Sequence, residues 1–190
     1  MQKIYRAVRE PRTMEFPRAM TNRSPGNVPY FVDNIWEWLR PASMPSRRRS
    51  AFASPTPELA ARAAGVSDQH VYLVEFQGRQ RCAQIYRSDD PSDARHHADL
   101  RRIRQTVDRY ILPKGWLDRP ATARGPLGAL FLPCLEKEEV EVCLQDLDAG
   151  PLREACSFWD DVRPIDEASD LHESGEIFFE GAYALRPVRT

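Results

Sequence analysis

The chain has 190 residues, of which 42% are hydrophobic and 29% are charged, and its formal net charge is −1. This length suits one domain and this composition excludes general disorder, so we expect residues 1–190 to form a single compact domain. The near-neutral charge excludes a strong overall attraction to nucleic acid or to anionic membrane surfaces. No stretch approaches the roughly 18 apolar residues that a membrane-spanning helix needs.

In the first quarter of the chain, residues 4–8 predict an opening strand. Residues 10–29 hold four prolines and few apolar side chains, which predicts a long Pro/Arg-rich loop, and loops of this length are usually functional or mobile. Residues 30–39 place apolar side chains at helical spacing, and Pro41 ends this predicted helix. We expect the basic residues 45–49 to form a solvated loop.

Residues 50–54 predict a short buried strand that runs directly into a helix. Thr56 can cap this helix, Pro57 suits its first turn, and Gly65 can close it. Residues 70–76 and 81–86 then predict two strands of a hairpin.

The second half of the chain mixes helices and strands without regular alternation. We expect helices over 92–110 and 152–162 and strands over 128–133, 139–144, 176–179 and 182–188. This order favours an α+β fold with mixed or antiparallel sheets over a doubly wound parallel sheet.

The cysteines and the N-terminus favour a cytoplasmic location. No apolar run of a signal peptide follows the first residues. The cysteines form no Cys-x-x-Cys pair and have no histidine at ligand spacing, so we expect reduced thiols and no metal site. The four positions are Cys82, Cys134, Cys143 and Cys156.

Three short segments suggest nucleotide chemistry, although none matches a common nucleotide-binding motif. Arg6 lies on the opening strand, where its planar guanidinium can bind a diphosphate. Ser54 and Thr56 lie where a strand meets a helix start, a place that favours phosphate. Glu176 precedes an apolar strand, where a carboxylate can stabilise positive charge on a ribose carbon. Each segment also has an ordinary structural interpretation: an edge-strand arginine, a well-capped helix, and a solvated charge.

Together, these residues resemble the arginine–serine–glutamate layout of the ADP-ribosyltransferase superfamily. The resemblance implies that Arg6, Ser54 and Thr56 hold NAD as a substrate and that Glu176 is the catalytic glutamate. Glu139 and Glu141, which enter another predicted strand, are competing candidates for that role.

Two functions follow as hypotheses. The first is a toxin-, effector- or defence-type enzyme that transfers ADP-ribose to a macromolecular acceptor, protein rather than nucleic acid, or that hydrolyses NAD. The second is a non-catalytic inhibitor or adaptor that binds a protein partner through the 10–29 loop and the Trp36/Trp38 pair, because aromatic and arginine side chains dominate such surfaces.

Overall fold

The computed structural model describes residues 2–9, 22–24, 26, 28–66, 70–86, 94–106, 118–120, 123, 125–166 and 171–188. The chain forms two compact units, each assembled from separate segments. Unit 1 comprises Met1–Thr21, Ala42–Pro91 and Asp161–Thr190, and unit 2 comprises Asn22–Pro41 and Ser92–Asp160. Helices and antiparallel sheets are both present, which confirms the α+β class. The grouping of residues 1–190 into one domain stays a prediction.

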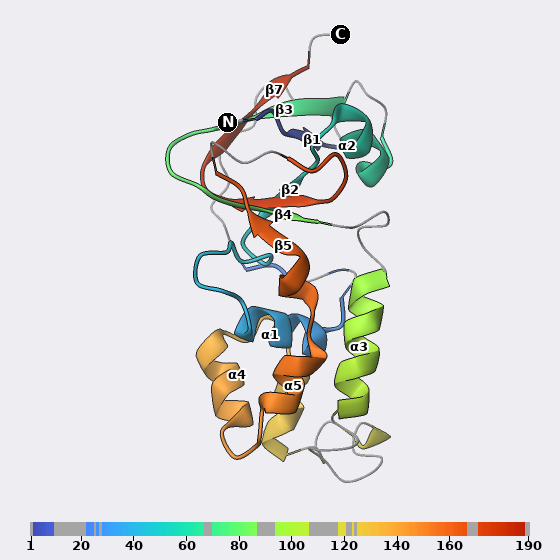
Figure 1. The fold of residues 1–190 in the computed structure, drawn as a ribbon, viewed down its shortest axis with the longest axis vertical. Coiled ribbons are helices and arrows are strands. Elements are labelled where there is room, and N and C mark those ends of the chain that lie inside the picture. The colour runs from blue at the N-terminus through green and yellow to red at the C-terminus, as the bar shows by residue number, and fades with distance from the viewer. Residues whose placement is uncertain are drawn as a thin grey trace. The chain divides into compact units, whose positions relative to one another are not determined.

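Unit 1 contains two antiparallel sheets (Figure 1). The first has the order β1-β3-β7, with β1 at Tyr5–Ala7, β3 at Val71–Phe76 and β7 at Tyr183–Pro187. The second has the order β2-β6-β4-β5, with β2 at Ala51–Ala53, β6 at Ile177–Glu180, β4 at Arg81–Ile85 and β5 at Val162–Pro164. The predicted first, second and last two strands are therefore confirmed.

The hairpin predicted over residues 70–86 is wrong, because β3 and β4 belong to different sheets. β3 pairs with β7, and β4 pairs with β6. The segment that joins β3 to β4 and the segment that joins β6 to β7 thus run antiparallel from one sheet into the other. They bend at the same place, where the Gln77 N–H donates to the Ala182 carbonyl at 2.8 Å. Gly181 permits this bend: its φ is 130°, and an added Cβ would lie 3.1 Å from the Gln80 Cβ. Apolar alternation identified both strands, but it carries no information about their partners.

The apolar core of unit 1 draws on both sheets. Tyr72, Val74 and Leu185 come from the first sheet, and Ile177 and Phe179 come from the second. Successive side chains of a strand point to opposite faces. The core-facing positions Ile177 and Phe179 therefore leave residues 176, 178 and 180 on the other face of the second sheet.

α2 at Pro57–Ala64 is the element that the sequence predicted most completely. The Thr56 side chain accepts a hydrogen bond from the Leu59 N–H at 3.3 Å, Pro57 lies in the first turn, and Gly65 ends the helix at a φ of 65°. Ala60 and Ala61 pack against Val71 in a small apolar cluster. The helix therefore forms because local capping signals and an apolar face agree.

Unit 2 is helical in its described part. It contains α1 at Tyr30–Trp38, α3 at Ala94–Thr106, η5 at Gly125–Phe131, α4 at Lys137–Leu144, α5 at Gly150–Ala155 and η6 at Phe158–Asp161. The predicted helices at 30–39 and 92–110 are confirmed within the described residues. The predicted helix over 152–162 is instead split among α5, η6 and β5.

Two strands predicted for the second half are wrong. Residues 128–133 lie mostly in the 3₁₀ helix η5, and residues 139–144 lie in α4. A capping box between Glu136 and Glu139 starts α4. Val140 and Leu144 are buried one helical turn apart, while Val142 is exposed. Val140 and Leu144 alone fit the helical period, all three residues fit the strand period, and the capping box favours the helix.

Candidate functional site

Arg6, Ser54 and Glu176 lie on three neighbouring segments of unit 1. Ser54 forms an antiparallel bridge with Tyr5, the residue before Arg6. The Tyr5 N–H donates to the Ser54 carbonyl at 2.9 Å, and the Ser54 N–H donates to the Tyr5 carbonyl at 2.7 Å. This bridge brings the end of β2 against β1 and places Ser54 one residue from Arg6.

The opposite edge of Ser54 faces Glu176. Ala53 pairs with Ile177 in the ladder of β2 and β6, so the next opposed positions are Ser54 and Glu176. The backbone N–H and C=O of Ser54 both hydrogen-bond with Tyr5, so Ser54 and Glu176 are not joined by backbone hydrogen bonds. The bridge and the strand register therefore place the three residues on adjacent backbone segments. Their side chains do not share a face, because Arg6 pairs with the core residue Tyr72, whereas Glu176 lies on the face away from the core.

The Arg6 guanidinium lies at the free edge of β2. Its Nη1 donates to the Phe52 carbonyl at 2.8 Å. Its Nε is buried and has no hydrogen-bond partner among the described residues. Buried donors are almost always paired in folded proteins. The Arg6 Nε is therefore an unsatisfied donor that solvent does not reach.

Glu176 combines partial exposure with a perturbed acidity. Its side chain is 32% exposed, and its Oε2 lies 3.4 Å from Nη2 of Arg47. Burial raises the pKa of Glu176 above its ordinary value, and the charge and hydrogen bond of Arg47 lower it only part of the way back. A carboxylate that is both reachable and costly to ionise is typical of functional sites.

The turn before Glu176 is pinned to β4. The Gln84 Nε2 donates to the His172 carbonyl at 2.9 Å, and the Gln84 Oε1 accepts from the His172 N–H at 2.9 Å. Gly175 has a φ of 112°, and an added Cβ would lie 2.1 Å from the Ile85 carbonyl oxygen. The Ile85 N–H then donates to the Glu176 carbonyl at 3.0 Å. These contacts fix the turn that carries Glu176.

Arg47, Gln84 and Gly175 are the site residues that the sequence analysis missed. Residues 45–49 were expected to form a solvated loop, yet Ser46 and Arg48 are buried. Arg47 lies with its guanidinium carbon 5.5 Å from the centroid of the Phe52 ring. A run of arginines is normally predicted to be exposed to solvent when no acidic partner is evident in the sequence. Here the partner of Arg47 is Glu176, which lies 129 residues away along the chain.

The other sequence candidates have different surroundings. The Thr56 hydroxyl oxygen is occupied as the cap of α2, so a role in NAD binding stays a prediction. Glu139 and Glu141 lie on a helix of unit 2, not at the entry of a strand. The Glu139 side chain accepts from the Glu136 N–H at 2.8 Å as part of the capping box. The structure therefore groups neither glutamate with Arg6 and Ser54, which belong to unit 1.

The Trp36/Trp38 pair does not form the exposed interface expected of it, because both side chains are buried. The Trp36 Nε1 donates to Asp99 at 2.8 Å, and the ring stacks on Phe158 with centroids 4.3 Å apart. The Arg153 guanidinium carbon lies 4.1 Å from the centroid of the Trp38 ring. Most of the 10–29 loop lies outside the described residues.

Three of the four cysteine thiols have a raised pKa. All four cysteines are free. Burial raises the pKa of Cys82 to about 12, and it also raises the pKa of Cys143 and Cys156. Thiols with raised pKa values stay protonated at neutral pH and react slowly.

Unit 2 contains a separate cleft of about 300 Å³. Tyr30, Phe31 and Phe131 line it, with Arg104 and Asp118 paired at 3.7 Å. Neither Arg6, Ser54 nor Glu176 lines this cleft. That these three residues line a pocket of their own stays a prediction.

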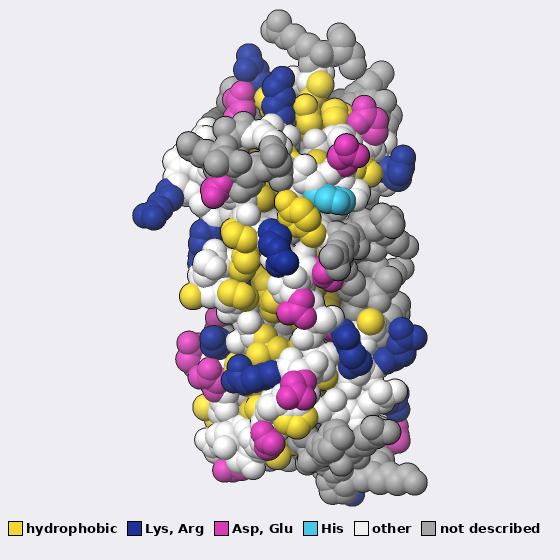
Figure 2. Space-filling view, viewed as in Figure 1, with side chains coloured by type: hydrophobic (Ala, Val, Ile, Leu, Met, Phe, Trp, Pro, Cys, Tyr) yellow, Lys and Arg dark blue, Asp and Glu magenta, His cyan; other side chains and the backbone are white. Residues whose placement is uncertain are grey.

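The face drawn in Figure 2 intersperses Lys and Arg with acidic side chains rather than gathering them in one basic patch. Within the described residues, no group of three or more His, Cys, Asp or Glu side chains could hold a metal ion. No described helix is long and apolar enough to cross a membrane. No family model, curated protein or solved structure matches this chain.

Proposed function

We propose that this chain uses NAD as a substrate and transfers ADP-ribose to a macromolecular acceptor or to water. One observation carries the proposal: the strand register sets Ser54 against Glu176 on one side and against the neighbour of Arg6 on the other. The backbone segments of an arginine, a serine and a glutamate that are 48 and 122 residues apart in sequence are thereby adjacent. The family resemblance supplies the roles that this proposal gives to the three residues.

Each residue has a distinct task in this proposal. The NAD molecule supplies the bond that breaks, between nicotinamide and the ribose carbon, and the nicotinamide nitrogen leaves with the bonding electrons. The Arg6 guanidinium binds the diphosphate. The Ser54 hydroxyl hydrogen-bonds the bound substrate. The Glu176 carboxylate orients a ribose hydroxyl and stabilises the positive charge that develops as nicotinamide leaves.

The acceptor is water or a nucleophilic side chain, which attacks the ribose carbon and loses its proton. A protein acceptor is favoured over nucleic acid. The net charge of −1 provides no overall attraction for a polyanion, and the face in Figure 2 mixes both signs of charge.

The test is nicotinamide release from NAD by the purified chain, with melting temperature measured in parallel. We expect release and an increase in melting temperature at millimolar NAD, because a ligand that binds only the folded state stabilises it by about 2.7 kcal/mol at a hundredfold excess over its dissociation constant. Absence of both effects would overturn the proposal. The adaptor hypothesis would then remain, without the tryptophan anchors that motivated it.

A further inference from the structure

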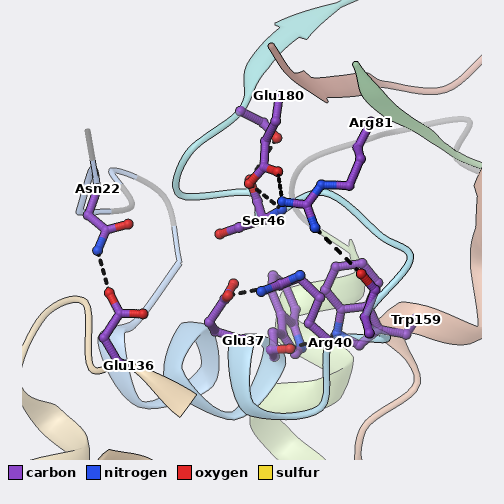
Figure 3. Close-up of polar contacts among 11 residues, drawn as sticks. Asn22, Glu37, Arg40, Ser46, Arg81, Glu136, Trp159 and Glu180 are labelled. Carbon is purple, nitrogen blue, oxygen red and sulfur yellow. Dashed lines mark hydrogen bonds and ion pairs between the residues drawn. The ribbon is translucent and has the colours of Figure 1, made fainter. Parts of the chain in front are cut away.

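The segment 45–49, here named the strap, folds into a closed turn that leads into β2. The Arg49 N–H donates to the Ser46 carbonyl at 3.2 Å, and the Ser50 hydroxyl donates to the same carbonyl at 2.6 Å. The Ser46 N–H donates to Oε1 of Glu180 at 3.0 Å, and Arg81 pairs with the other oxygen of Glu180 (Figure 3). The strap is thus tied to the second sheet next to Arg47.

The strap meets the second sheet at two carboxylates of the same strand. Glu176 and Glu180 are four residues apart along the β6 segment and share a face with Phe178 between them. Ser46 contacts Glu180, and Arg47 contacts Glu176 at 3.4 Å. The Arg47 guanidinium also lies over Phe52, which pairs with Phe178. The turn of the strap, the Phe52 ring and the Glu176 carboxylate together fix the position of the Arg47 guanidinium.

Among the described residues, Arg47 is the cation paired with Glu176. Ser54, which follows β2, and Ile85 on β4 flank Glu176 and are neutral. On the preceding turn the ionisable residues are His172 and the exposed Glu173. On the strap, Arg48 and Arg49 follow Arg47. Arg47 is the group whose charge and hydrogen bond counter the burial of Glu176.

We propose that Arg47 is a positioning residue, which holds the Glu176 carboxylate ionised and in one orientation for the NAD reaction of the proposed function, on which this inference rests. An arginine suits this role better than a lysine, because its planar fork can stack on Phe52 while donating to the carboxylate. Arg47 therefore belongs to the site rather than to the solvated surface. It acts through Glu176 and not by contact with the reacting atoms.

The experiment combines two readouts on the full chain. The first is an NMR titration of the ¹³C-labelled Glu176 carboxyl group, which needs no activity. The second is steady-state nicotinamide release. The variants are Arg47→Gln, Arg47→Lys and, as the matched control on the same strap, the exposed Arg49→Gln. Melting curves verify that each variant folds.

We expect Arg47→Gln to raise the pKa of Glu176 and to lower kcat by about 10- to 100-fold with little change in KM, since misplacing a catalytic group by about 1 Å costs up to about 100-fold. Arg47→Lys should restore part of the pKa effect and part of kcat, and Arg49→Gln should resemble the wild type in both. If Arg47→Gln does not fold, the Arg47→Lys titration decides alone.

The two proposals fail in different ways. An unchanged Glu176 pKa in folded Arg47 variants, or an equal change in Arg49→Gln, overturns the role of Arg47 whatever the activity. An increase in KM with an unchanged kcat also overturns this role, because that result assigns Arg47 to substrate binding. If the pKa of Glu176 rises in Arg47→Gln but the wild type itself releases no nicotinamide, the enzyme proposal is overturned. The effect of Arg47 on the ionisation of Glu176 then still stands.

Discussion

Two carboxylates, one in each unit, show how differently this molecule treats an acidic side chain. Asp99 in unit 2 is 1% exposed and accepts hydrogen bonds from the Trp36 Nε1, the Ser157 N–H and hydroxyl, and Arg102. Glu176 in unit 1 is 32% exposed and has one cationic partner, Arg47, at 3.4 Å. A buried carboxylate with several donors is a structural anchor. A partly exposed one whose ionisation is incompletely compensated is suited to chemistry.

The largest expected effect separates the two by activity. Glu176→Gln keeps the size of the side chain and removes its charge, so we expect nicotinamide release to fall by about 10²- to 10³-fold, the scale of losing one electrostatic stabiliser. NAD binding and the fold should survive. Glu141→Gln, on α4 of unit 2, is the control and should keep full turnover. Loss of turnover in Glu141→Gln with an active Glu176→Gln would show that the wrong glutamate has been assigned.

The second prediction separates them by stability. Asp99→Ala leaves the Trp36 indole and Ser157 donors without their acceptor, so we expect the free energy of unfolding to fall by about 2–4 kcal/mol. Urea denaturation followed by tryptophan fluorescence measures this loss directly. Glu176→Ala, the counterpart in unit 1, should cost much less. Equal losses in the two variants would remove the distinction between anchor and functional group.

The third prediction tests the turn that carries Glu176. Gly175→Ala would place a Cβ 2.1 Å from the Ile85 carbonyl oxygen, whereas Gly78→Ala, also at positive φ, would meet no atom within 4 Å. Both changes strain the backbone, but only the first adds a clash. We expect Gly175→Ala to be less stable than Gly78→Ala by about 1–3 kcal/mol, the usual range for overpacking, and to lose turnover. Thermal melts and nicotinamide release of the pair compare them, and similar melts would contradict the fixed turn.

The smallest expected effect concerns pH. The pKa of Glu176 is raised in the folded chain, so its contribution to stability is full below the unfolded pKa and is lost as pH rises through the folded pKa. Glu176→Gln cannot ionise and escapes this loss. We therefore expect it to melt at an equal or slightly higher temperature than the wild type at neutral pH, with the difference disappearing in acid. A variant less stable only at neutral pH would show that the Arg47 pair outweighs the burial cost.

Elements whose signals are local were predictable from sequence. Thr56, Pro57 and Gly65 define α2 because capping and helix termination depend on neighbouring residues alone. The short apolar strands β1, β2, β6 and β7 were also found, since alternation and bounding turn residues are local patterns. α4 was mistaken for a strand because Val140, Val142 and Leu144 follow the strand period, whereas only Val140 and Leu144 follow the helical period.

The sequence by itself determined the α+β class, the well-capped helix and the candidates Arg6, Ser54 and Glu176. Only the tertiary structure decided that β3 and β4 enter different sheets, that Ser54 lies between Tyr5 and Glu176, and that Arg47 reaches Glu176. The physical reason is the distance along the chain over which each interaction acts. Secondary-structure propensity and helix capping depend on a few neighbouring residues. Strand register and ion pairing here join positions more than a hundred residues apart. A run of arginines in the sequence therefore does not reveal which carboxylate one of them will pair with.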